Sequence, residues 1–146
     1  AVFLSRSDES QILGTHMVQP FTLDGKEWPS VEHYFQAMKF ETTSPEYFEK
    51  IRLAPDAKKA RKLGATRFKK LRDDWKKVRR VVMTRTVYTR SHAYPDSKSA
   101  LLETAKRKII ENSQYDYYWG CGRDRRGENI YGQVLMDVRE KLSSEA

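Results

Sequence analysis

The chain has 146 residues, of which 38% are hydrophobic and 33% charged, and its formal net charge is +8. This length suits one domain with its own core, and the aromatic content of 12% argues against disorder. One cysteine, Cys121, excludes an internal disulfide, and neither a signal-peptide run nor a membrane-spanning stretch is present. We therefore expect a soluble cytoplasmic protein that does not bind membranes. The positive net charge suggests that its binding partner is anionic.

The first part of the chain predicts two small β elements. Residues 2–4 have the pattern of a short strand, and residues 5–15 are polar and loop-like. Residues 21–28 alternate apolar and polar side chains around Asp24-Gly25, which is typical of a β-hairpin.

The hairpin leads into an amphipathic helix, which begins after Pro29 with Ser30 as its N-cap. At 100° per residue the apolar side chains fall in one arc, formed by Val31, Tyr34, Phe35 and Met38. Beside this arc the spacing i, i+4, i+7 aligns a polar stripe of Glu32, Gln36 and Lys39. On spacing alone, such a stripe is more typical of a solvated helix face than of a site.

The rest of the chain predicts four more helices, one strand and a last helix. Caps and periodicity indicate helices over residues 44–53, 55–64, 73–91 and from 95, a strand over 108–111, and a helix over 130–142. On the long helix we expect a buried arc of Trp75, Val78, Val82, Thr86 and Thr89, widened by Val81 and Tyr88. Together these elements predict an α+β, predominantly helical fold with a small β-hairpin near the N-terminus.

Two further stretches stand out by composition. Residues 58–72 are dense in lysine and arginine, which suits either a solvated surface or a phosphate site with Arg61 and Arg67 as bidentate donors. Residues 112–129 form a long, aromatic segment with three glycines. Such a loop is either functional, with Trp119 as a platform for a planar base, or a cover over the core.

The chain resembles the YbiA/NADAR family in several motifs that occur in order along it. These are residues 28–40 (WPSVEHYFQAMKF), Trp75 and Met83, D-x-x-W-G-x-G at 116–122, G-x-N at 127–129, and G-x-x-L-M-x-x-R at 132–139. The resemblance implies a single compact YbiA-like domain over residues 1–146 that hydrolyses an N-glycosidic bond. Its substrate would be a phosphorylated riboside, such as an early riboflavin-pathway intermediate, or ADP-ribose on guanine, either free or with nucleic acid as the carrier of the modified base.

That chemistry suggests roles for the polar stripe. Glu32 would stabilise positive charge at C1 and act as acid and base, and the resemblance favours Lys39 as a nucleophile that forms a Schiff base. Gln36 would orient the reacting groups. Asp116 is counted as a third catalytic residue, which would bind a ribose hydroxyl or a base amine. The expected substrate-binding residues are Gln36, Arg61, Arg67, Trp119, Gly120 and Asn129.

One segment departs from the family pattern. The family usually has Ser-Asn-Phe just ahead of the hairpin, where an ungapped alignment here gives Gly14, Thr15 and His16. We expect this change to affect the choice of substrate more than the type of reaction. His16 and His33 fit a loop and a structural position better than a catalytic one.

Other functions stay open at this point. The scattered histidines give no metal-ligand spacing and no glycine-rich nucleotide loop follows a strand, so we expect neither a metal nor a cofactor. The basic and aromatic stretches also fit a nucleic-acid-binding module, and the resemblance also fits a non-catalytic NAD- or ADP-ribose-binding domain.

Overall fold

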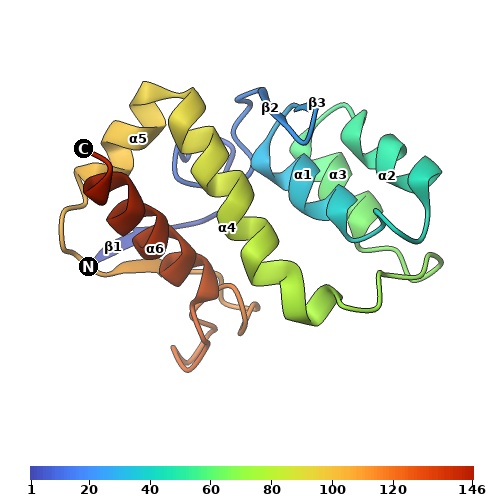
Figure 1. The fold of residues 1–146 in the computed structure, drawn as a ribbon. Coiled ribbons are helices and arrows are strands. Elements are labelled where there is room, and N and C mark those ends of the chain that lie inside the picture. The colour runs from blue at the N-terminus through green and yellow to red at the C-terminus, as the bar shows by residue number, and fades with distance from the viewer.

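The longest helix, α4 (Trp75–Ala93), runs through the middle of the molecule and separates two groups of elements (Figure 1). The structure, a computed structural model, describes all of residues 1–146. On one side of α4 lie β2 (Phe21–Leu23), β3 (Lys26–Trp28), α1 (Val31–Met38), α2 (Pro45–Arg52) and α3 (Ala57–Gly64). On the other side lie β1 (Val2–Leu4), α5 (Pro95–Leu102), β4 (Ile109–Glu111) and α6 (Ile130–Ser144).

The strands form two separate two-stranded sheets. In the first, β1 pairs in parallel with β4, so that Val2 lies opposite Ile109. In the second, β2 and β3 form the predicted hairpin, and Asp24 and Gly25 at its turn have φ angles of 55° and 74°. Positive φ at both turn positions is what the tight hairpin turn of an Asp-Gly pair requires. The predicted α+β, mainly helical fold with a small hairpin is confirmed.

Three helices of the first group begin with a side-chain cap, at or next to the predicted starts at residues 30, 44 and 55. The side chains of Ser30, Ser44 and Asp56 each accept a hydrogen bond from the backbone N–H three residues later. Such a bond satisfies one of the donors that a helix start leaves free, which explains why these boundaries are readable from the sequence.

Helix α4 buries a face that differs from the predicted one. Val82 and Thr86 are buried as expected, but Val81 is 67% exposed and its predicted burial is wrong. The buried face continues instead to Met83, Val87 and Arg90, because α4 packs against α1 on one side and α6 on the other. An apolar arc alone does not indicate that a helix has two packing partners.

Helix α1 is buried around its whole circumference. It contacts α2, α3 and α4, and each of its eight residues is buried, including Glu32 and Gln36. The solvated-face interpretation of the polar stripe is therefore wrong. His33 is a structural residue, since its ring bonds the Ser30 hydroxyl at 2.7 Å and the Ala54 carbonyl at 3.1 Å.

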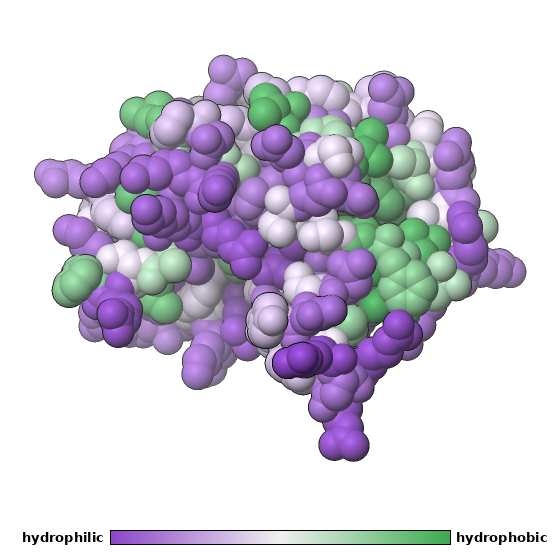
Figure 2. All heavy atoms as spheres, turned by 180° about the vertical axis from the view of Figure 1, so that it is seen from behind, coloured by the Kyte–Doolittle hydropathy of each residue, from purple (hydrophilic) through white to green (hydrophobic).

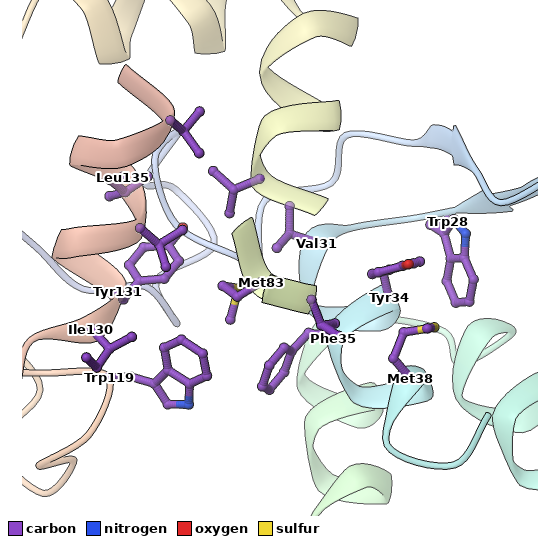
Figure 3. Close-up of a cluster of buried hydrophobic side chains, with 14 of the residues drawn as sticks. Trp28, Val31, Tyr34, Phe35, Met38, Met83, Trp119, Ile130, Tyr131 and Leu135 are labelled. Carbon is purple, nitrogen blue, oxygen red and sulfur yellow. The ribbon is translucent and has the colours of Figure 1, made fainter. Parts of the chain in front are cut away.

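The core is one cluster of buried apolar side chains from both groups of elements. Figure 3 shows Phe35 of α1, Met83 of α4 and Trp119 of the long loop gathered between the helices. The face seen in Figure 2 is mostly polar, and its largest apolar patch lies toward one side. No helix combines the length and the apolar character needed to cross a membrane.

Candidate active site

A cavity of about 200 Å³ lies where α1, α3, α4 and the long loop meet. Its lining combines charged, polar and apolar side chains: Arg6, Glu32, Phe35, Gln36, Lys39, Arg61, Ala65, Met83, Asp116 and Trp119. Glu32, Gln36 and Lys39, which the sequence places in one row along α1, thus form part of one wall. A few placed polar side chains beside apolar walls are typical of a ligand-binding or catalytic pocket.

Glu32 is a buried carboxylate with a donor on each oxygen. Its Oε1 accepts from Nε2 of Gln36 at 2.8 Å, and its Oε2 accepts from the hydroxyl of Thr15 at 2.7 Å. Burial by itself raises the pKa of Glu32, but His16 and the hydrogen bonds from Gln36 and Thr15 outweigh it, so the pKa lies below its ordinary value. Burial also lowers the pKa of His16. The hydrogen bonds from Gln36 and Thr15 favour the ionised form of Glu32 whether or not His16 is charged.

Gln36 connects the carboxylate to helix α3. Its amide nitrogen is bonded to Glu32, whereas its Oε1 is buried without a hydrogen-bond partner in the protein. The side chain packs directly on Gly64, where a Cβ would lie 2.7 Å from Cδ of Gln36. Helix α3 does end at Gly64 as predicted, but the reason for glycine is this close approach, because its φ is not positive.

Lys39 has an unusual environment for a lysine. Its Nζ donates to the carbonyl oxygen of Gly64 at 3.2 Å and lies 5.8 Å from the ring centre of Phe35. Burial lowers the pKa of Lys39 to about 8, partly opposed by the charge of Glu32. A substantial fraction of the amine is therefore neutral near physiological pH, which is the state in which a lysine is a nucleophile.

Asp116 is held in place by several donors. Its Oδ1 accepts from the backbone N–H groups of Tyr118 and Trp119, and its Oδ2 accepts from Nη2 of Arg6 at 2.8 Å. Burial by itself raises the pKa of Asp116, but the charge of Arg6 and these hydrogen bonds lower it by more. The pKa therefore lies below its ordinary value, and the carboxyl group stays ionised. Arg6 also bonds the fully buried Glu111 through Nη1 at 3.3 Å.

Trp119 forms the apolar side of the cavity. It is 8% exposed and meets Phe35 edge to face, with ring centres 5.2 Å apart (Figure 3). Its ring is thus an anchored part of the core that presents only a small area to the cavity. The long loop was expected either to be functional or to cover the core. Trp119 does both, since it packs in the core and lines the cavity.

Comparison with known proteins agrees with this geometry. Residues 1–143 match the NADAR domain. The chain belongs to the NADAR family. It is 36% identical to N-glycosidase YbiA of Escherichia coli over 143 residues, which are 98% of this chain and 88% of that protein. The NMR structure of E. coli YbiA matches 99% of this chain and 86% of that chain, with a TM-score of 0.86 and 35% identity.

Two further relatives have related names. An N-glycosidase of Nostoc punctiforme is 35% identical over 116 residues, which cover 79% of this chain and 74% of that protein. A riboflavin biosynthesis protein of Vibrio vulnificus is 37% identical over 125 residues, covering 86% of this chain but 34% of that larger protein. The predicted membership of the YbiA/NADAR family is therefore confirmed.

The cavity includes most, but not all, of the predicted site residues. Besides those already described, Arg61 of α3 lines the cavity as an exposed cation without an ion pair. Arg67 is exposed in the loop after α3 and is not part of the lining. Gly120 packs against Glu111 instead. The Asn129 amide bonds the backbone of β4, at Ile109 and Glu111.

Three residues outside the predicted set support this cavity, and one of them, Thr15, lies in the segment expected to affect the choice of substrate. Arg6 and Thr15 come from the loop after β1, and Arg90 of α4 holds that loop by donating to the Gly14 carbonyl. In the sequence, Arg90 follows Met83 and Val87 at helical spacing. An arginine on an apolar helix face is the one sequence signal that could have indicated such a buried contact. No group of three or more histidine, cysteine, aspartate or glutamate side chains is placed to hold a metal ion.

Proposed function

We propose that this chain is an N-glycosidase that cleaves the bond between C1 of a ribose and the nitrogen of a planar base. The observation that carries the proposal is the pair of Lys39 and Glu32 on one cavity wall, the first with a lowered pKa of about 8 and the second ionised. The relatives named N-glycosidase in E. coli and Nostoc punctiforme support the same reaction.

Lys39 acts as the nucleophile in this proposal. The ribose ring of the glycosylamine opens as its C1–O4 bond breaks, O4 takes a proton from solvent, and a protonated imine forms at C1. The neutral Lys39 amine adds to that carbon. The bond from C1 to the base nitrogen then breaks, which leaves a Schiff base between C1 and Nζ. Water adds to C1, the bond to Nζ breaks, and the free sugar leaves while Lys39 is regenerated.

Glu32 moves the protons for these steps. As an ionised carboxylate it first takes a proton from the Lys39 nitrogen when that nitrogen bonds C1 and becomes positive. It then gives the same proton to the departing base nitrogen. Later it accepts a proton from the attacking water and returns it to Nζ as the C1–Nζ bond breaks, and the C1 hydroxyl releases its proton to solvent to give the free sugar. Its negative charge also stabilises the cationic character at C1 throughout.

The remaining lining residues bind the substrate. The unpaired Oε1 of Gln36 accepts from a sugar hydroxyl or the base amine, and Asp116 accepts from a ribose hydroxyl. Trp119 contacts the base, and the unpaired guanidinium of Arg61 binds phosphate. With Arg67 away from the cavity, Arg61 alone is assigned to the phosphate.

The shape of the site favours a substrate that extends beyond the cavity. At about 200 Å³ the cavity is smaller than the ~300 Å³ or more of typical small-molecule sites. Arg61 and Asp116 also line a second hollow of about 430 Å³, together with Ser113, Gln114 and Tyr115. We place the ribose in the inner cavity and the phosphate-bearing part over Arg61 in the outer one.

The substrate class follows from this arrangement and from the relatives. A phosphorylated ribosylamino-pyrimidine of the early riboflavin pathway fits it, and the Vibrio vulnificus relative carries a riboflavin biosynthesis name. ADP-ribose on guanine, free or in nucleic acid, contains the same bond beside a larger anionic group. We propose the first as the preferred substrate.

A direct assay tests the proposal and ranks the two substrates. Each is incubated with the protein, and the released base is quantified by mass spectrometry. We expect release from the phosphorylated ribosylamino-pyrimidine, and loss of at least about 10³-fold in rate for Glu32→Gln. Binding of either compound without base release would favour a non-catalytic ligand-binding domain. Binding of oligonucleotides alone, weakened by salt, would favour a nucleic-acid-binding module.

A further inference from the structure

A second cavity, of about 450 Å³, lies between the β1–β4 sheet and the loop before α6. It shares no lining residue with the Lys39 cavity. Its walls come from the strands and from residues 112–129 of the long loop, of which Gln114 also lines the outer hollow beside Arg61. The side chains that matter for binding are Phe3, Lys108, Ile110, Arg123 and Arg125.

The charge of this second cavity is entirely positive. Lys108, Arg123 and Arg125 line it, and none of their side chains makes an ion pair or hydrogen bond within the protein. No aspartate or glutamate is among the lining residues. The neighbouring Arg126 differs, since its Nε lies 3.8 Å from Oδ2 of Asp124. Three unpaired cations around one hollow create a potential that attracts an anion.

The second cavity also offers an apolar, aromatic surface. Phe3 and Ile110 are register partners on β1 and β4, so their side chains project on the same side of the sheet. Phe3 is 49% exposed, and the guanidinium carbon of Arg125 lies 5.7 Å from its ring centre. An arginine plane near an exposed phenylalanine ring suits a planar group that inserts against either of them.

We propose that this cavity is a second ligand site, which binds a phosphorylated small molecule with a planar ring, such as a nucleoside monophosphate. The phosphate binds Arg123 and Lys108 through charge-assisted hydrogen bonds, and the planar ring packs on the exposed part of Phe3 beside Arg125. The site is independent of the chemistry at Lys39, so its occupancy requires no turnover.

Calorimetry with adenosine monophosphate and with inorganic phosphate tests both parts of this site. We expect the nucleotide to bind about tenfold or more tightly than phosphate, because the ring adds contact that phosphate lacks. Arg125→Ala should weaken nucleotide binding about tenfold, since it removes a cation of the cavity and a neighbouring contact of the planar ring. Phe3→Leu, which keeps an apolar side chain on the strand, should weaken nucleotide binding and leave phosphate binding unchanged.

Matched controls separate this site from general surface charge and from the Lys39 cavity. Arg126→Ala removes an adjacent, paired arginine and should leave nucleotide affinity within about twofold. Adenosine monophosphate is itself a phosphorylated riboside, so the titrations are repeated in Arg61→Ala, which removes the phosphate-binding cation of the first cavity; binding that depends on Arg125 should persist there. Amide NMR shifts on nucleotide addition should centre on residues 3, 110 and 121–125. The proposal is overturned if Arg126→Ala weakens binding as much as Arg125→Ala, if Arg61→Ala abolishes it, or if nucleotide and phosphate bind equally or not at all.

Discussion

The hydroxyl of Thr15 donates to Oε2 of Glu32 at 2.7 Å and lies 3.0 Å from Nδ1 of His16. The carboxylate on α1 is thereby oriented by a loop residue 17 positions earlier, in the segment that departs from the usual family pattern. Thr15 is fully buried, so its side chain contacts the proposed acid/base residue Glu32 and is not exposed to a substrate.

Replacing Thr15 by valine should raise the pKa of Glu32, because a donor to the ionised form is lost. A Glu32 with a lowered pKa stabilises the fold above its unfolded pKa, and this contribution is lost as the pH falls through the folded value. We expect Thr15→Val to cost about 1–3 kcal/mol in unfolding free energy at pH 7. The acidic limb of the pH–rate profile should move to higher pH. Thr22→Val, on an exposed strand position, should change neither.

Replacing Gly64 by alanine should disturb the site more than the fold. The new Cβ would lie 2.7 Å from Cδ and 2.9 Å from Cβ of Gln36, so that side chain must move and release Glu32. We expect a stability loss of about 1–3 kcal/mol and a larger relative loss of activity. Adding Gln36→Ala should recover most of the stability but none of the activity. Full activity in Gly64→Ala would show that the Gln36 contact is dispensable.

Lys39 should make the unfolding free energy depend on pH in an alkaline window. Its folded pKa of about 8 lies below the ordinary 10.5, so the unfolded chain binds more protons between these values and stability rises with pH there. Lys39→Met should remove this rise and be more stable than the parent at pH 7 by on the order of 1–3 kcal/mol. Denaturant titrations at pH 7 and 10 measure this, with the exposed Lys62→Met as the control. Parallel pH curves for parent and Lys39→Met would contradict the lowered pKa.

Arg6 should be a major stabilising residue, because it neutralises a buried charge. Without it, Glu111, which is fully buried, loses its charged partner, and Asp116 loses the donor to Oδ2. We expect Arg6→Met to cost about 3–5 kcal/mol, with part recovered by adding Glu111→Gln. Arg80→Met breaks an exposed pair with Asp137 and should cost less than about 1 kcal/mol. Equal costs for the two arginines would contradict this assignment.

Local signals explain why most helix boundaries were predictable from the sequence. The caps at Ser30, Ser44 and Asp56 act within three residues, and the Asp24-Gly25 turn acts within four, so neighbouring residues contain the information. The position of Glu32 next to Gln36 follows in the same way from helical spacing.

Contacts between distant segments account for what was not predicted. Arg6 and Glu111 are 105 residues apart in sequence, and their pairing depends on β1 lying beside β4. The exposure of Val81 and the burial of Arg90 depend on which helices flank α4. Asn129 was predicted to contact ligand, but its amide is bonded to strand backbone that local sequence does not reveal.

Chemical trapping of Lys39 tests the proposed mechanism most directly. The protein is mixed with the phosphorylated ribosylamino-pyrimidine and sodium borohydride, which reduces a Schiff base to a stable amine, and the digested chain is examined by mass spectrometry. The account predicts a ribose-phosphate adduct on Lys39, absent in Lys39→Arg and retained in Lys62→Arg. Release of the base with no adduct on Lys39, or undiminished release by Lys39→Arg, would contradict it.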